Sequence, residues 1–258
     1  MLTIEGHGHV RNRATMELTR PLLKLLVELG TGSRRKLSSA IRQGRVQVNG
    51  VVIEDFSYPV DRGCDTVSMD EKQLELQAEP KVYLMLNKPA GVLSTTKDTR
   101  GRKTVISILP EKYQRLRIYP VGRLDKNSTG LLLLCNDGQL TYQLTHPKFE
   151  HEKEYLLLAG KRLQPRDLRK FETGIQLDDG ITCSANIREL SPPSPFNYSI
   201  IIHEGRKRQL RRMFGALGYR VLALKRVRIG RLELGELKEG RTRELSPGEI
   251  KMLLADTR

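Results

Sequence analysis

A single carboxylate lies among basic and hydroxyl side chains in the segment GRLDKNSTGLLLLCNDG, residues 122–138. Asp125 follows Arg123 by two residues and shortly precedes the apolar run 131–135. Such a carboxylate can act as a nucleophile or as a base when an arginine keeps it ionised and apolar neighbours partly desolvate it. Asp is also a common cap for a turn such as residues 126–130. The spacing favours neither role over the other.

The residues after Asp125 imitate the first half of a calcium-binding EF-hand loop. The twelfth position of that loop requires a bidentate glutamate, but the chain has Asn136 there, which argues against calcium. The sequence also lacks a phosphate-binding P-loop, a zinc-protease helix, a serine nucleophile elbow and a dinucleotide-binding glycine fingerprint. Its five histidines and three cysteines do not group at ligand spacing. We therefore expect a reaction without a metal or a cofactor.

The charge of the chain predicts a polyanionic partner. Its 45 Lys and Arg against 30 Asp and Glu give a formal net charge of +15 over 258 residues. This favours nucleic acid first and an acidic membrane surface second. Residues 29–53 and 205–232 contain basic residues and no acid, so we expect two separate nucleic-acid contact surfaces. The candidate contact residues are Arg34, Arg35, Lys36, Arg42 and Arg45 in the first stretch, and Arg206, Lys207, Arg208 and Arg212 in the second.

The sequence also predicts a compartment. No apolar run approaches the roughly 20 residues of a membrane span, and the N-terminus lacks an apolar core of signal-peptide length. We interpret the three widely separated cysteines (Cys64, Cys135 and Cys183) as small buried hydrophobes in a reducing compartment. These features predict a cytoplasmic protein without a membrane segment. We expect a monomer, because the sequence has no obvious association stripe.

Residues 19–53 predict a helix, a turn, a second helix and a hairpin. Thr19 can cap the first helix, which should end at Gly30, and Ser33 can cap the second. Asn49-Gly50 between alternating valines is a strong two-residue hairpin turn. Three cations in the first turn of the second helix oppose the helix dipole, which indicates a role in binding. The alternative is a solvated basic face.

Beyond Glu79-Pro80, which we expect to be a linker, strands and helices mix. Residues 130–135 predict a fully buried strand, Asp137 can cap the helix that follows, and residues 206–218 predict a basic amphipathic helix. The pattern predicts an α+β fold with mostly antiparallel strands. We divide the chain into an N-terminal extension (1–18), a small domain of two helices plus a β-hairpin (19–77) and a larger domain (78–258).

Several segments, in order, resemble a known family. GRLDKNSTGLLLLCNDG resembles the signature of bacterial ribosomal RNA pseudouridine synthases, in particular type A for the small ribosomal subunit, and types B, E and F for the large one. YLMLNKPAGVLSTTKDTRGRKTVISILP, HEKEYLL and EGRKRQLRRMFGALGYRVLALKRVRIG resemble further motifs of the catalytic domain of this family. GSRRKLSSAIRQGRVQVNG is similar to the RNA-binding module of the ribosomal protein S-four type. The resemblance implies an S-four-type RNA-binding domain followed by a mixed-sheet pseudouridine synthase catalytic domain.

The resemblance implies a cofactor-free isomerase that detaches uracil from its sugar at nitrogen and rejoins it through carbon. Asp125 matches the family's catalytic aspartate, which either attacks the anomeric carbon of the sugar or removes a neighbouring sugar proton. Tyr155 matches the tyrosine that stacks on the uracil, and Arg211 matches the basic partner of the aspartate. Arg123 matches the arginine that holds the uridine in its flipped-out conformation, and Leu210 matches an apolar wall of the pocket.

The substrate implied by the resemblance is ribosomal RNA or a precursor of a ribosomal subunit. We prefer the B-like branch, which acts on the large subunit, and we place the A-like branch, which acts on the small one, next. The opposing hypothesis is a non-catalytic RNA-binding factor for ribosome assembly that uses the same two basic surfaces. Asp125 separates the two hypotheses, because a protein that only binds RNA has no need for an acid in a cationic cleft.

Overall fold

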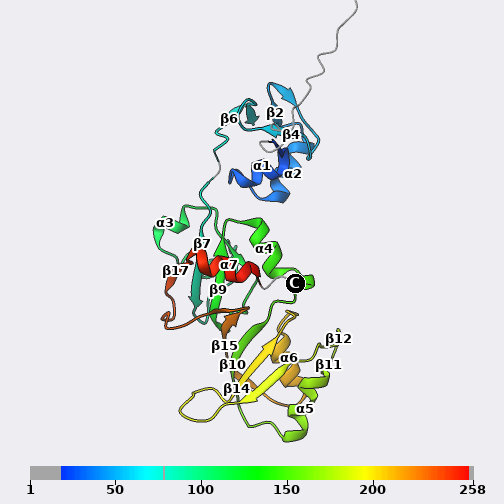
Figure 1. Ribbon diagram of the computed structural model, residues 1–258, viewed down its shortest axis with the longest axis vertical. Helices are drawn as coiled ribbons and strands as arrows, with labels where there is room; N and C mark the ends of the chain where they lie inside the picture. The colour runs from blue at the N-terminus through cyan, green and yellow to red at the C-terminus, as the bar shows by residue number, and fades with distance from the viewer. Residues whose placement is uncertain (1–18, 78, 256–258) are drawn as a thin grey trace, which may run out of the picture. The chain divides into compact units, whose positions relative to one another are not determined.

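The computed structural model of the chain describes residues 19–77 and 79–255 (Figure 1). The extension expected over residues 1–18 lies outside these residues. The chain divides between Pro80 and Lys81 into two compact units, and each has its own hydrophobic core. None of the helices in the described ranges is long and apolar enough to cross a membrane.

The first unit combines two helices with two small sheets. Its elements are β1 (Thr19–Pro21), α1 (Leu22–Glu28), α2 (Arg34–Arg42), β2 (Val46–Val48), β3 (Val51–Val52), β4 (Pro59–Asp61), β5 (Val67–Met69) and β6 (Lys72–Leu74). Strand β1 pairs with β4, and the order β3-β2-β5-β6 forms the other sheet. The apolar faces of both helices enclose the core, in which Leu22, Leu26 and Ile41 are fully buried.

The second helix and the hairpin of this unit are confirmed. The Ser33 side chain accepts a hydrogen bond from the N–H of Lys36, and Asn49 and Gly50 take positive φ values of 51° and 79°. The cap predicted at Thr19 is wrong, because Thr19 pairs within β1 and α1 begins after Pro21 without a side-chain cap. The hairpin is also larger than predicted, because β5 and β6 extend it into a four-stranded sheet.

The second unit is built on one large mixed sheet. Its elements are β7 (Tyr83–Lys88), α3 (Glu111–Gln114), β8 (Tyr119–Val121), β9 (Thr129–Cys135), α4 (Gly138–Thr145), the 3-10 helix η2 (Pro147–Phe149), β10 (Lys153–Ala159), α5 (Pro165–Thr173), β11 (Gln176–Leu177), β12 (Gly180–Ile181), β13 (Asn186–Glu189), β14 (Tyr198–Ile202), α6 (Gln209–Ala216), β15 (Val221–Ile229), β16 (Leu232–Glu233), β17 (Thr242–Glu244) and α7 (Pro247–Ala255).

The strands of this sheet follow the order β13-β14-β10-β15-β9-β7-β17, with β8 paired to β9 and β16 to β15. Among the described residues, every pair in the sheet is antiparallel except β9 with β15. Strands β11 and β12 form a separate hairpin. The α+β class and the mostly antiparallel sheet are confirmed.

The uninterrupted apolar run of β9 is explained by burial on both faces. Leu132 and Leu134 pack into the core that includes α5 and α6, whereas Leu131 and Leu133 pack with α4 and α7. A strand that is covered on both faces has no exposed alternate positions, so it carries no polar alternation. Asp137 caps α4, as predicted, by accepting hydrogen bonds from the backbone of the first turn.

Gly130 is required where β9 runs parallel to β15. It has a φ of +100° and lies opposite Arg226 in the strand register. A Cβ atom at residue 130 would lie 2.1 Å from the carbonyl oxygen of Arg226, so a larger residue does not fit unless a strand moves. This close approach places the backbone of Arg226 against the start of β9, where the loop that carries Asp125 ends.

The interpretation of all three cysteines as buried hydrophobes is wrong for two of them. Cys135 is buried at the end of β9. Cys64 and Cys183 are exposed, because they lie in irregular segments after β4 and β12 and not in a packed strand.

Candidate active site

Asp125 lies in the loop that connects β8 to β9, and its side chain is half-buried. The turn of this loop is closed by the main chain, because the carbonyl oxygen of Asp125 accepts a hydrogen bond from the N–H of Ser128 at 3.0 Å. No described residue donates a hydrogen bond to the Asp125 carboxylate. The carboxylate is therefore not used as a cap for the turn.

A buried lysine holds this loop in place. Lys88, at the end of β7, is fully buried, and its Nζ donates to the carbonyl oxygens of Pro89 at 2.8 Å, Lys126 at 3.2 Å and Ser128 at 2.9 Å. Burial lowers the pKa of Lys88 to about 8, and the negative charges of Glu239 and Asp125 oppose this change. The carbonyl groups of Lys126 and Ser128 belong to the turn that follows Asp125, so Lys88 ties the end of β7 to this turn.

The residues proposed for catalysis and substrate binding line one cavity of about 510 Å³. The loop after β8 contributes two of them, β10 contributes one and the first turn of α6 contributes two. These residues are Arg123, Asp125, Tyr155, Leu210 and Arg211. The structure thus brings together side chains that are up to 88 positions apart in the chain.

Arg211 and Asp125 share this cavity without forming an ion pair. Nη1 of Arg211 donates to the carbonyl oxygen of Val221 at 3.0 Å, and its Nε is buried without a partner among the described residues. Burial lowers the pKa of Arg211, and the charge of Arg208 lowers it further, whereas Asp125 raises it. The charge of Asp125 therefore acts on Arg211 across the cavity, without a direct contact between the two side chains.

Two cations that the sequence analysis did not select also line the cavity. Arg226, on β15, is only 4% exposed, and Lys153, at the start of β10, is half-buried. Burial lowers the pKa of Lys153 to about 8, and the charge of Arg226 adds to this change. The available signal was the period of the strand, since Arg226 lies two residues after the buried Leu224 and shares its face.

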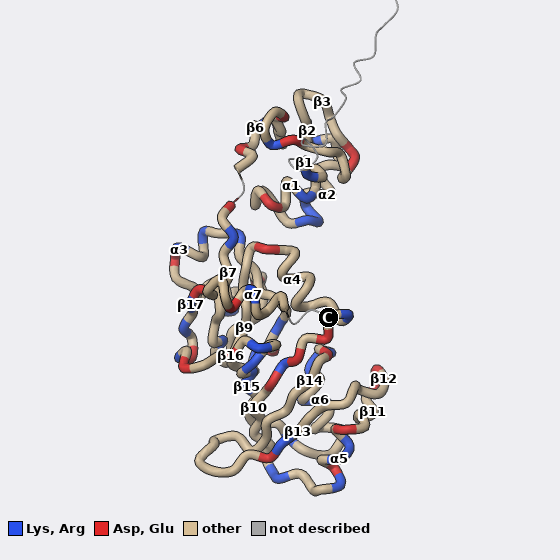
Figure 2. Tube along the Cα trace, in the orientation of Figure 1, with Lys and Arg blue, Asp and Glu red and all other residues tan. Residues whose placement is uncertain are grey.

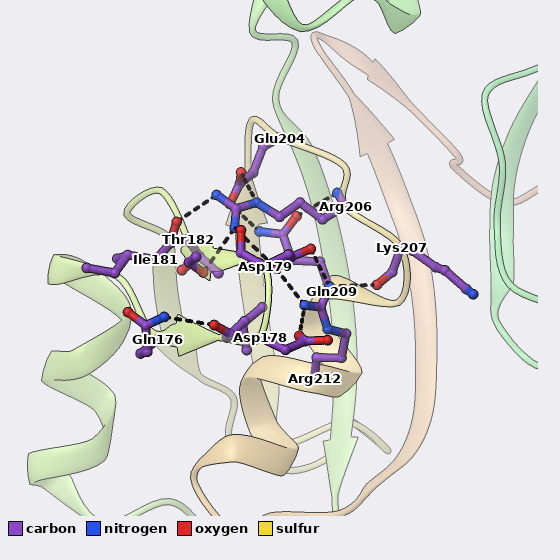
Figure 3. Close-up of polar contacts among 12 residues, drawn as sticks. Gln176, Asp178, Asp179, Ile181, Thr182, Glu204, Arg206, Lys207, Gln209 and Arg212 are labelled. Atoms are coloured by element: carbon purple, nitrogen blue, oxygen red, sulfur yellow. Dashed lines mark hydrogen bonds and ion pairs between the residues drawn. The ribbon is translucent and has the colours of Figure 1, made fainter.

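The basic cluster at the start of α6 divides into engaged and exposed cations (Figure 3). Its members are Arg206, Lys207, Arg208 and Arg212. The Arg206 guanidinium donates to Glu204 at 3.0 Å and to the carbonyl oxygen of Ile181 at 2.6 Å. The Arg212 guanidinium binds Asp179 at 2.6 and 2.9 Å and also pairs with Asp178. These contacts fasten the β11–β12 hairpin to the start of α6.

The other two cations of the cluster face solvent. Lys207 and Arg208 are exposed, and the Lys207 side chain points away from the network in Figure 3. The helix predicted from residue 206 is wrong at its start, because Arg208 takes a left-handed conformation with a φ of 52° and α6 begins at Gln209. The contacts of Arg206 with the hairpin hold this segment out of the helix.

Figure 2 shows Lys and Arg positions along α2 of the first unit. The candidate RNA contacts of this unit divide into exposed and engaged cations in the same way. In the first turn of α2, Arg34, Arg35 and Lys36 are exposed, and no described acid pairs with their side chains. Arg45 forms a two-point ion pair with Asp70, with both distances 2.6 Å. The Arg42 guanidinium lies 5.2 Å from the ring centre of Phe56.

Comparison with known proteins places this chain in a family. Residues 82–216 match the sequence model of the family described as RNA pseudouridylate synthase, and the chain belongs to this family. Residues 20–67 match the model of the S4 domain. The sequence resemblance is therefore confirmed for both parts of the chain.

Individual relatives cover nearly the whole chain. The ribosomal large subunit pseudouridine synthase B of Bacillus subtilis (strain 168) is 43% identical over 238 residues, which are 91% of this chain and 95% of the relative. An uncharacterized RNA pseudouridine synthase of Aquifex aeolicus (strain VF5) is 39% identical over 89% of this chain and 92% of its own length. A crystal structure of a pseudouridylate synthase is similar with a TM-score of 0.64 and 32% identity, over 90% of this chain and 98% of that chain.

Proposed function

We propose that this chain isomerises a specific uridine of ribosomal RNA to pseudouridine, with Asp125 as the catalytic carboxylate. The observation that carries the proposal is the cavity, in which the half-buried Asp125 carboxylate lies among several cations and accepts no hydrogen bond from a described residue. A cavity of about 510 Å³ is large enough for a nucleoside that has left its base stack. The reaction is an isomerisation, so it consumes no co-substrate and needs no cofactor.

Each cavity residue has a role in this proposal. Asp125 attacks the anomeric carbon of the sugar or removes a neighbouring sugar proton, and Arg211 balances its charge across the cavity. Tyr155 stacks on the uracil and assists proton transfer. Leu210 is the apolar wall of the pocket, and Arg123, which is exposed at the rim, holds the flipped-out conformation of the target nucleotide.

RNA affinity comes from two surfaces in this proposal. Residues 19–77 act as an RNA-binding domain through Arg34, Arg35 and Lys36, whose side chains are exposed on α2. In the catalytic domain, residues 78–258, Lys207 and Arg208 are the exposed cations next to the cavity. Arg206, Arg212, Arg42 and Arg45 contribute less, because their guanidinium groups already contact acids, carbonyl groups or a ring.

We place RNA of the large ribosomal subunit, or a precursor particle that contains it, first among the substrates, and RNA of the small ribosomal subunit next. The support is the 43% identity to the Bacillus subtilis relative, which is named for the ribosomal large subunit. The enzyme acts as a monomer in this proposal.

The experiment is a map of pseudouridines in the ribosomal RNA of cells that lack this protein, by carbodiimide labelling and primer extension. Complementation uses wild type, Asp125→Asn and, as a control for lost negative charge, Glu172→Gln on the exposed side of α5. We expect one site to be lost in the deletion and restored by wild type and Glu172→Gln alone. No lost site, or restoration by Asp125→Asn, would favour a non-catalytic assembly factor.

A further inference from the structure

Arg226 is a buried cation beneath the candidate stacking tyrosine. Its Nε donates to the carbonyl oxygen of Leu131 at 2.8 Å, and its Nη1 donates to the hydroxyl oxygen of Tyr155 at 3.5 Å. The guanidinium carbon lies 6.0 Å from the centre of the Tyr155 ring. Strand β15 thus places the permanent positive charge of Arg226 against Tyr155, which lines the cavity from β10.

This charge has no direct ion-pair partner among the described residues. The Asp125 carboxylate lines the same cavity, but no Asp or Glu oxygen of the described residues lies within 4.0 Å of the Arg226 guanidinium, and Nη2 of Arg226 is buried without a hydrogen-bond partner. The neighbouring cation, Lys153, adds to the positive potential and donates its own hydrogen bond to a carbonyl group, that of His151. A buried charge whose direct partners are all neutral destabilises a fold, and such a cation beside a cavity is suited to stabilise an anion bound there.

The proposed reaction produces such an anion, and the inference therefore rests on the proposed function. When the bond from the anomeric carbon to N1 breaks, its electron pair stays on uracil and spreads over N1, O2 and O4. When C5 then bonds to the anomeric carbon, the C5 proton leaves and N1 takes up a proton, so atoms and electrons balance without a co-reactant. The negative charge exists only between these two steps. A fixed cation stabilises this state more than it stabilises neutral uridine.

We propose that Arg226 stabilises the detached uracil anion and acts through the hydroxyl group of Tyr155. Because the Tyr155 oxygen accepts a hydrogen bond from Arg226, its own hydrogen points to another acceptor, and the cavity is the side where uracil supplies one. Arg226 is a positioning and polarising residue in this scheme, whereas Tyr155 contacts the base. The charge lies in a low-dielectric site, where its effect on a nearby anion is strong.

The test compares two leaving groups in single-turnover reactions of wild type, Arg226→Met and Arg226→Lys. One RNA carries uridine at the target and the other carries 5-fluorouridine, whose fluorine withdraws electrons and stabilises the detached base without help. The readout is loss of the target nucleoside, because fluorine blocks the last proton removal. We expect Arg226→Met to slow the uridine substrate by about 100-fold and the fluorinated substrate by less than about tenfold. Arg226→Lys should recover most of the loss.

Two controls separate this role from a structural one. Lys225→Met removes the adjacent charge on β15 from a side chain that does not line the cavity, and it should leave the ratio of the two rates unchanged. Arg226→Met in a Tyr155→Phe background should have a much smaller effect than in wild type, because the hydroxyl group that transmits it is missing. If Arg226→Met fails to fold, Tyr155→Phe alone carries the test. It should slow the uridine substrate more than the fluorinated one, so the ratio of the fluorinated rate to the uridine rate should rise.

The outcomes are distinguishable. Equal slowing of both substrates by Arg226→Met, or an unchanged rate ratio in Tyr155→Phe, would overturn the role of Arg226 and leave the proposed function intact. If wild type converts no uridine in any ribosomal RNA, the proposed function fails and the role of Arg226 fails with it.

Discussion

Asp125 and Arg211 face the same cavity, yet Nη1 of Arg211 donates its hydrogen bond to the carbonyl oxygen of Val221 and not to the carboxylate. Nε of Arg211 is buried without a partner among the described residues. Arg211 therefore holds an unused donor, while the Asp125 carboxylate has unused acceptor positions. In the proposed enzyme, both groups are therefore available to the reacting nucleotide.

The first prediction concerns this pair. Arg211→Met should lower the single-turnover rate by about 100-fold, because the cavity loses a cation that faces Asp125. RNA affinity should change by less than about threefold, since the charge contacts the reacting nucleotide and not the length of the RNA. The double variant with Asp125→Asn should be no slower than Asp125→Asn alone. Fully additive losses in rapid-quench measurements would contradict the pairing.

The second prediction distinguishes the cations of the first unit. Arg34→Ala with Arg35→Ala should weaken RNA binding and reduce the slope of log Kd against log salt by about 0.7 to 0.9 for each phosphate group that is no longer neutralised. Arg45→Ala is the matched control, because its ion pair with Asp70 already occupies the guanidinium. Filter binding over a salt series measures both. A loss of affinity in Arg45→Ala as large as half the loss in the double variant would mean that the ion pair opens on RNA.

The third prediction concerns the basic cluster at the start of α6. Arg212→Ala should detach the β11–β12 hairpin, so amide hydrogen exchange at residues 176–181 should accelerate by about tenfold or more. Lys207→Ala with Arg208→Ala should leave that exchange unchanged and weaken RNA binding instead. Mass spectrometry of exchanged peptides, together with binding measurements, tests the division. Faster exchange in the second variant would show that all these cations support the hairpin.

The fourth prediction concerns the close approach of β9 to β15. Gly130→Ala should lower the free energy of unfolding by more than about 3 kcal/mol, because its Cβ would overlap the Arg226 carbonyl and its φ is positive. Gly215→Ala in α6 is the control, since no atom lies within 4 Å of its Cβ and its φ is ordinary. That change should be neutral or stabilise by about 0.5 kcal/mol. Chemical denaturation of both variants gives the comparison.

The fifth prediction follows from the pKa of Lys153, which burial, and then the charge of Arg226, lower to about 8. Between pH 8 and the ordinary lysine pKa of 10.5, the unfolded chain holds a proton that the folded chain has released. This group therefore makes the free energy of unfolding rise with pH in that window. The rise should be smaller in Lys153→Met. Parallel stability curves of the two proteins between pH 8 and 10.5 would contradict the lowered pKa.

Much of the fold could be predicted because its signals are local. Ser33, Asn49-Gly50 and Asp137 act on backbone groups within three residues, so their side-chain types alone indicate a cap or a turn. The apolar run 131–135 also predicts a buried strand from residue types alone, since a strand covered on both faces carries no polar alternation. The family motifs, which lie in one order along the chain, identified the class that the comparisons confirm.

The tertiary structure alone decided which charges are free. Arg206 and Arg212 look like RNA contacts in sequence, but the β11–β12 hairpin brings Asp178 and Asp179 to them from about 30 positions away. Arg226 is one of ten cations in an acid-free stretch, and only the pairing of β15 with β9 and β10 buries it under Tyr155. Residue types and spacing determine hydrogen bonds within a turn. The partner of a charge depends on which distant strands lie side by side.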